Sequence, residues 1–113
     1  MGDRARFTAT IAVGEKFNEI FNDITNTRRY FYGYERCVVL KNTKGSKFML
    51  VCLGSKPRGY VEVRWDSVNG ENAIHILIEG DTKFVEDMMG TIDYILNKHG
   101  LSVIDGEHNL VWL

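Results

Sequence analysis

The spacing of apolar residues changes along the chain, and the first two patterns predict a strand followed by a helix. Residues 4–13 alternate between apolar and polar, which is the period of a strand with one buried face. After Gly14 the apolar residues recur every three or four positions over residues 15–26, the spacing along one face of a helix. These helical apolar positions are Phe17, Ile20, Phe21 and Ile24. We therefore expect a half-buried strand and an amphipathic helix at the start of the sequence.

Four strand-like segments follow with little sequence between them, at residues 35–41, 47–53, 60–68 and 73–79. The first two flank a loop that contains Gly45, and the last two flank Asn69-Gly70, a dipeptide typical of two-residue hairpin turns. Residues 54–59 hold the only proline and two glycines, which indicates another loop. Consecutive strands joined by short turns predict an antiparallel meander.

A second helix is predicted after Asp81-Thr82, a pair that suits a helix start. Apolar residues recur at helical spacing over residues 84–99, and Gly100 suits the helix end because glycine readily adopts the left-handed conformation found there. Gly90 lies inside this helix, where glycine costs about 1 kcal/mol relative to alanine. We interpret Gly90 as a point of close packing on the sheet. Further along, Asp105-Gly106 between two apolar runs predicts one or two short strands, in the second case a hairpin.

The predicted element order is therefore β-α-β-β-β-β-α-β. Each helix has one apolar face, so the economical arrangement packs both helices on one face of an antiparallel meander sheet. Phe, Ile, Met and Trp at nearly every inward position predict a filled core between the two layers. A length of 113 residues is typical of one domain. We expect one α+β domain over residues 1–113.

This order of elements, over residues 4–99, resembles the family of folds that includes the TATA-binding protein repeat and the Bet v 1/START-like helix-grip domains. The resemblance lies in element order and is carried by no motif. Helix-grip domains have more strands and finish on a long helix, whereas this chain has four strands between its predicted helices and continues after the second. The resemblance implies a ligand cavity between helix and sheet, which the predicted filled core argues against.

Charge and composition give no global reason to expect nucleic acid or an anionic membrane as partner. The chain has 14 basic and 15 acidic residues and a net charge of −1. Residues 1–6 lack the apolar segment of a signal peptide, and every apolar run is shorter than the ~18 residues that indicate a membrane-spanning helix. We expect a cytoplasmic protein without membrane attachment. We interpret Cys37 and Cys52, both in apolar strand segments, as buried free thiols, with a disulfide or a metal pair as alternatives.

One face of the last predicted hairpin gathers polar side chains. Pairing across Asn69-Gly70 places Glu62, Arg64, His75 and Glu79 on the same face. A carboxylate beside a histidine can form an acid/base pair, while the alternative is a solvated face with cross-strand ion pairs. We favour the ion pairs, because the sequence supplies no nucleophile or oxyanion hole beside these residues.

No motif in the sequence indicates a metal, a cofactor or a reaction. The three histidines and two cysteines are not spaced as metal ligands on one element. The glycines are scattered singly through turns, so none forms a phosphate-binding loop at a helix start. We therefore expect no cofactor, no metal site, no catalytic residue and no enzymatic activity.

Two aromatic and basic segments are the remaining candidates for binding. Residues 28–34 hold four aromatic rings and two arginines, and residues 56–60 add two basic side chains and a tyrosine. Arginine and aromatic residues are typical anchors of protein interfaces, and they also bind single-stranded nucleic acid by holding phosphates and stacking on bases. A structural role at the edge of the core is the third alternative. The predicted binding residues are Arg28, Arg29, Tyr30, Tyr32, Tyr34, Lys56, Arg58 and Tyr60.

The sequence thus favours a small, non-catalytic binding module with a protein partner, which could be a second copy of the chain. Self-association is favoured because the first and last predicted strands each offer a possible sheet edge, and unpaired edges recruit strands. Binding of single-stranded nucleic acid by the Arg/Tyr patch is one alternative. A small-molecule pocket or minimal enzyme of the helix-grip kind is another.

Overall fold

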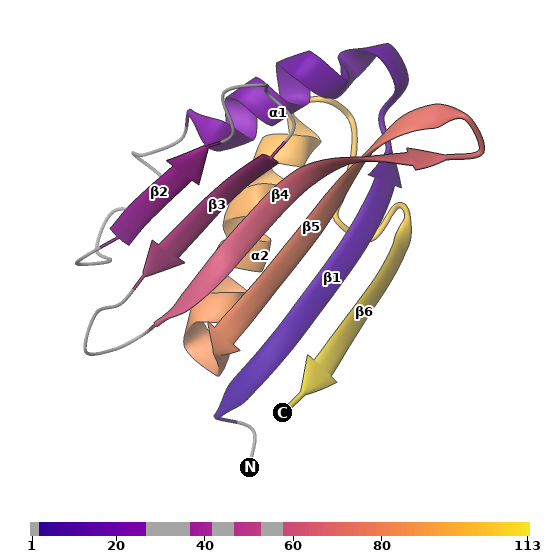
Figure 1. Ribbon diagram of the computed structural model, residues 1–113. Helices are drawn as coiled ribbons and strands as arrows, with labels where there is room; N and C mark the ends of the chain where they lie inside the picture. The colour runs from indigo at the N-terminus through magenta and orange to yellow at the C-terminus, as the bar shows by residue number, and fades with distance from the viewer. Residues whose placement is uncertain (1–2, 27–36, 42–46, 53–57) are drawn as a thin grey trace.

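The computed structural model describes residues 3–26, 47–52 and 58–113, and the backbone of residues 37–41. Figure 1 shows one twisted sheet with two helices behind it. The described elements, in chain order, are β1 (Arg4–Ala12), a short 3-10 helix (Gly14–Lys16), α1 (Phe17–Thr25), β2 (Cys37–Lys41), β3 (Lys47–Cys52), β4 (Gly59–Val68), β5 (Glu71–Asp81), α2 (Thr82–Asn97) and β6 (Glu107–Trp112). The predicted α+β class, with an antiparallel sheet and two helices, is confirmed.

The sheet has the strand order β2-β3-β4-β5-β1-β6, and each neighbouring pair is antiparallel. Strands β2 to β5 are neighbours in chain order, as a meander requires. β1 lies beside β5, and β6 lies on the other side of β1 (Figure 1). Among the described residues, β2 and β6 are therefore the two edges of the sheet.

The Asn69-Gly70 turn joins β4 to β5 as predicted. Asn69 has φ +53° and Gly70 has φ +78°, so both central residues are left-handed. This conformation gives a two-residue turn whose twist matches that of the flanking strands. Because the register of a hairpin follows from its turn, the turn also decides which side chains of β4 and β5 share a face.

The core lies between the helices and one face of the sheet. The apolar stripe of α1 is buried as the sequence predicts, and Phe17 stacks on Phe21 with ring centroids 5.4 Å apart. The inward positions of β1 and β5 are buried too. The largest fully buried side chains are Phe7, Phe21, Phe48, Phe84, Ile11, Ile20, Ile24, Leu50, Ile74, Ile76, Ile78 and Met88. Side chains of this size fill the space that a ligand would occupy in a helix-grip domain.

The helix ends differ slightly from the predicted ones. Residues 14–16 form a 3-10 turn, so α1 begins at Phe17, two residues later than expected. α2 begins after Asp81 and ends at Asn97. Gly100 has φ +74°, and the Leu101 N–H beyond it donates to the Leu96 carbonyl at 3.0 Å. This return of the chain onto the last turn is the role predicted for Gly100.

The predicted hairpin at Asp105-Gly106 is wrong, and the single-strand alternative holds. β6 pairs with β1 instead of with residues 101–104. The Asp93 carboxylate of α2 accepts hydrogen bonds from the Ser102 hydroxyl (2.8 Å) and the Val103 N–H (3.0 Å), and this fixes the connection as a turn. The edge of β1 that does not pair with β5 pairs with β6, so the last strand is joined to a segment distant in sequence and not to the adjacent residues 101–104.

The interpretation of Gly90 as a close-packing position is also wrong. Gly90 is exposed, and a Cβ at this position would meet nothing within 4 Å. The close approach occurs instead at Gly59, which is opposite Gly80 in the β4–β5 ladder. A Cβ on Gly59 would lie 2.4 Å from Cδ1 of Phe84 and 2.5 Å from the Glu79 carbonyl oxygen. Here the first turn of α2 packs directly on the backbone of β4.

The interpretation of Cys52 as a free thiol is wrong as well. Cys52 is disulfide-bonded and its side chain is buried. The only other cysteine in the sequence is Cys37, which is the residue opposite Cys52 in the β2–β3 ladder. Residues directly opposite on antiparallel strands have Cα atoms about 4.5–5.5 Å apart, within the range that a disulfide spans. Sequence spacing could not show that Cys52 lies opposite Cys37, because this depends on the register of two strands.

Neither described helix combines the length and the apolar character needed to cross a membrane.

Candidate functional site

The predicted binding residues fall partly outside the described residues. Arg28, Arg29, Tyr30, Tyr32 and Tyr34 belong to residues 27–36 and Lys56 to residues 53–57, which the structure does not describe. Their role stays a prediction. Arg58 and Tyr60 are described and lie at the start of β4. The structure can therefore be compared with the predicted patch only at these two positions.

Arg58 is held through its backbone. Its N–H donates to the Asp81 carboxylate at 3.0 Å, and its carbonyl accepts from the Asp81 N–H at 2.9 Å. The Arg58 residue itself is exposed. These two bonds join the start of β4 to the start of α2 and present Arg58 at the surface.

Tyr60 lies on the open face of the sheet, the face opposite the helices, and its hydroxyl is already engaged. The hydroxyl donates to Oε2 of Glu79 at 2.5 Å, and Arg6 lies 3.3 Å from the other oxygen of the same carboxylate. The hydrogen bond from Tyr60, together with the positive charge of Arg6, lowers the pKa of Glu79. The same hydrogen bond raises the pKa of Tyr60, aided by burial of the phenol. Tyr60 is thus part of a polar network across three strands.

The four polar residues expected on one face are indeed brought together. In the β4–β5 register, Arg64 is opposite His75, and Glu62 and Glu79 lie on the same face. Glu62 accepts ion pairs from Lys47 of β3 at 3.6 Å and from Arg64 at 3.8 Å. The carboxylates of this face are therefore partnered by cations, which is the arrangement of a cross-strand ion-pair face.

Among the side chains that the structure describes, the partner of His75 is a hydroxyl and not a carboxylate. Its Nδ1 lies 2.9 Å from the hydroxyl of Thr10 on the neighbouring strand. Burial and the adjacent Arg64 lower the pKa of His75, so the ring is neutral at neutral pH. Among the described residues, no three His, Cys, Asp or Glu side chains gather in a way that could hold a metal ion. The open face thus offers a histidine without the acidic partner that an acid/base pair requires.

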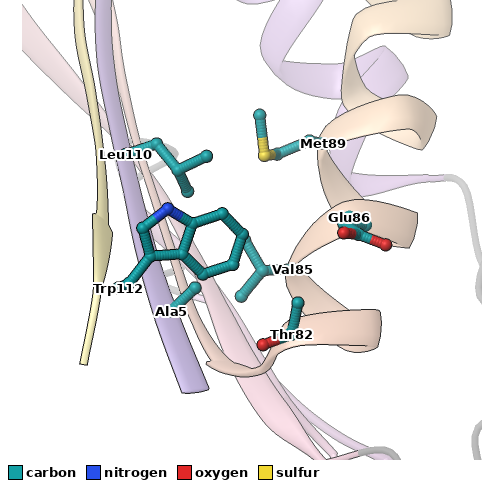
Figure 2. A pocket seen from close by; sticks show the side chains of 7 residues that line it. All are labelled: Ala5, Thr82, Val85, Glu86, Met89, Leu110 and Trp112. Carbon is teal, nitrogen blue, oxygen red and sulfur yellow. The ribbon is translucent and has the colours of Figure 1, made fainter. Parts of the chain in front are cut away.

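A second surface lies on the other side of the sheet, where β6 extends beside α2. Figure 2 shows Leu110 and Trp112 of β6 pointing toward Val85 and Met89 of α2 across a groove. The groove has a volume of about 270 Å³, and Ala5, Thr82 and Glu86 complete its lining. Trp112 is 56% exposed and Leu110 is 40% exposed, although the inward neighbours on β1 are fully buried. Large apolar side chains are therefore left accessible to solvent along this groove.

The outer edge of β6 presents backbone groups. The Leu113 N–H donates to the Arg4 carbonyl at 2.9 Å, so Leu113 directs its backbone groups toward β1. In an antiparallel ladder, successive residues direct these groups alternately to one neighbour and to the other. His108, Leu110 and Trp112 therefore direct their N–H and C=O groups away from β1. No strand among the described residues pairs with them there. We call this edge, together with the groove beside α2, the β6–α2 surface.

The sequence contained a signal for this surface that the predicted patch did not use. Residues 110–113 are apolar at every position, so both faces of a strand at this place carry apolar side chains. A strand with only one buried face alternates between apolar and polar residues. A run without alternation therefore indicates a strand that needs cover on both faces or at its edge. The groove itself could not be predicted, because it depends on the position of β6 beside β1 and α2.

No protein-family model matches this chain, and no curated protein matches its sequence. The function is therefore inferred from the geometry and chemistry of the described residues.

Proposed function

We propose that this protein is a non-catalytic interaction module that binds another protein molecule through the β6–α2 surface. The observation that carries the proposal is the exposure of Trp112 and Leu110 beside an apolar helix face, on a strand whose outer edge pairs with no strand in the described part of the chain. Contiguous apolar surface on a folded protein marks interaction sites, and open strand edges accept a further strand. Tryptophan is also among the residues that contribute most to the free energy of protein interfaces.

A small-molecule site is supported less well by the same surface. Pockets for small ligands usually have volumes of roughly 300–1,000 Å³ and enclose most of the ligand. The groove beside α2 is smaller, at about 270 Å³, and opens along β6. Its lining is almost wholly apolar, with Thr82 and Glu86 as the polar side chains, so it offers few groups to orient a small molecule.

The Arg/Tyr patch has one described basic residue, the exposed Arg58, and two other cations on the open face of the sheet are already paired with carboxylates. Arg6 is paired with Glu79, and Lys47 with Glu62. A cation already paired with a carboxylate gains less from a phosphate than a free one does. Residues 28–34 stay a candidate for an additional contact, and isolation of the partner at two salt concentrations separates a protein from a nucleic acid.

The test is affinity isolation of the tagged chain from cells that produce it naturally, at low and at high salt. We expect the wild type to retain a protein that high salt does not remove, because apolar contacts are insensitive to ionic screening. Trp112→Ser should lose that protein. Tyr94→Ser is the matched control, since Tyr94 is 55% exposed and lies on α2 about 180° around the helix axis from Val85 and about two and a half turns further along.

Two results would contradict the proposal. The first is a bound protein that both serine variants retain equally, which would place the contact away from β6. The second is recovery of nucleic acid that high salt removes, as expected for phosphate contacts. The ratio of absorbance at 260 and 280 nm distinguishes nucleic acid from protein in the eluted material.

A cytoplasmic location stays a prediction, and one finding weighs against it. Structural disulfides persist mainly in oxidising compartments and are rare in the cytosol. Cys52 is disulfide-bonded in the folded chain. Trapping of free thiols with an alkylating reagent at the moment of cell lysis would show whether this bond exists where the protein works.

A further inference from the structure

The backbone groups at the edge of β6 restrict how a second copy of this strand could pair with it. His108, Leu110 and Trp112 direct their N–H and C=O groups outward, as the Leu113–Arg4 hydrogen bond and the β1–β6 register require. A two-fold axis centred on Leu110 sets Leu110 opposite its own copy and His108 opposite Trp112. All outward backbone groups of these three residues then find partners. Centring the axis on either neighbouring residue leaves one of the three without a partner inside the strand.

The side chains of β6 suit the same register. On the side that faces the helices, Leu110 meets Leu110 of the second copy, and Trp112 meets His108. Cross-strand apolar and aromatic pairs stabilise such ladders, whereas like charges placed opposite destabilise them. Glu107, the acidic side chain of β6, lies opposite the leucine side chain of position 113 in this register. The side chains of β6 are therefore compatible with pairing to a second copy of the same strand.

The outer edge of β6 also lacks the features that prevent exposed strand edges from pairing with one another. Natural sheet edges are usually blocked by charged side chains, by proline or by a bulge. Residues 108–112 contain neither Asp, Glu, Lys, Arg nor proline, and the β1–β6 register runs without a bulge from Glu107 to Trp112. A strand of this composition at an open edge is stabilised when its exposed apolar residues, 38–56% accessible over residues 110–112, are covered.

From these observations we infer that the partner bound by the β6–α2 surface is a second copy of this chain. The two β6 strands pair antiparallel about a two-fold axis at Leu110, and the two sheets become one continuous sheet. The second copy's strand then bounds the open side of the groove beside Trp112 and removes apolar surface from water. This inference rests on the proposed function, because it names the partner of the same surface.

Charged substitutions of Leu110, the residue at the proposed two-fold axis, test both the identity of the partner and the strand register. Leu110→Lys places like charges opposite each other in a homodimer, and so does Leu110→Glu. Each variant alone should dissociate, with a dissociation constant raised roughly tenfold or more. In an equimolar mixture of the two variants, opposite charges face each other across the axis, so the dimer should form again. Light scattering coupled to size exclusion measures the mass, at several protein concentrations.

The matched control is Ile104→Lys, which adds the same charge at an apolar residue that is 61% exposed and lies before β6. This variant should remain dimeric. Far-UV circular dichroism and thermal unfolding of each variant, measured alongside, verify that the fold is intact. Leu110 is already 40% exposed, so a long charged side chain has access to solvent there.

Each other result overturns a specific part of the inference. A wild type that stays monomeric at every concentration excludes the second copy as partner, while the affinity isolation with Trp112→Ser still decides the proposed function. Dimeric wild type with equally dimeric Leu110 variants places the dimer contact elsewhere. Monomeric single variants whose mixture stays monomeric exclude the register centred on Leu110.

Discussion

At the scale of single residues, Tyr60 belongs to a polar network that joins three strands, and its predicted role in binding stays a prediction. Its hydroxyl donates a hydrogen bond to the Glu79 carboxylate of β5, and the same carboxylate forms an ion pair with Arg6 of β1. The network therefore spans β4, β5 and β1 on the open face. Its direct consequence is a depressed pKa for Glu79 and a raised pKa for Tyr60.

Tyr60→Phe should lower the free energy of unfolding by about 1 kcal/mol at neutral pH, since hydrogen bonds to charged groups contribute 1.5–3 kcal/mol and this one lies on a solvent-accessible face. Glu79 has a lowered folded-state pKa, so its contribution is present above the ordinary carboxylate pKa and is lost as pH falls through the folded value. Tyr60 has a raised pKa, so its contribution is lost at high pH. The stability difference between wild type and variant should thus be largest between these limits. Urea unfolding at a series of pH values measures it.

An NMR titration of the Glu79 side-chain carboxyl provides the complementary readout. In Tyr60→Phe, the pKa of Glu79 should move up toward its ordinary value, because its strongest partner is gone. An unchanged Glu79 pKa in the variant would show that Arg6 alone sustains the shift.

At the scale of elements, Gly59 and Gly90 have opposite roles in the packing of α2. Gly90 lies on the exposed side of α2 with open space around its Cα. Gly59 lies in β4 under the ring of Phe84, at the point where α2 begins. The helix packs on the sheet through Gly59 and gains nothing from Gly90.

Gly90→Ala should raise the free energy of unfolding by about 1 kcal/mol, because alanine has the higher helix propensity and nothing obstructs its methyl group. Gly59→Ala should lower it, since the new Cβ would approach Phe84 and the Glu79 carbonyl to within about 2.5 Å and force the first turn of α2 outward. Thermal unfolding of the two variants should shift the midpoint in opposite directions. A fall in the midpoint for Gly90→Ala would mean that the exposed side of α2 is covered by something in solution.

At the scale of the whole molecule, stability is shared between the core and a covalent bond near one edge of the sheet. Cys52 is disulfide-bonded in β3, and the sequence offers Cys37 of β2 as the second cysteine. In the chain-entropy model, a bond that closes a segment of this length stabilises the fold by about 3 kcal/mol. The bond therefore adds a covalent constraint to β3, which pairs with β2, an edge strand of the described sheet.

Cys52→Ala should lower the free energy of unfolding by about 3 kcal/mol, and a reducing agent should destabilise the wild type to a similar level. The reducing agent should leave Cys52→Ala unchanged, which is the internal control. Guanidinium unfolding with and without reductant measures both effects. Equal stability of reduced and oxidised wild type would show that the bond constrains neither the folded nor the unfolded chain.

The sequence by itself determined the class of fold, and the reason is local. The amphipathic periods of residues 15–26 and 84–99 each select one face of a helix, and the Asn69-Gly70 turn fixes the register of its hairpin, so short-range pattern is enough. The prediction of a single domain over residues 1–113 stays a prediction.

Only the tertiary structure decided which strand pairs with β6, that Cys52 is disulfide-bonded, and which apolar surface is exposed to solvent. Each depends on contacts between residues far apart in the chain: β6 on β1, Cys52 opposite Cys37, and Trp112 beside α2. Periodicity records whether a side chain needs burial, but not which distant element buries it. For that reason the sequence pointed to the Arg/Tyr patch, while the geometry of the described residues points to the β6–α2 surface.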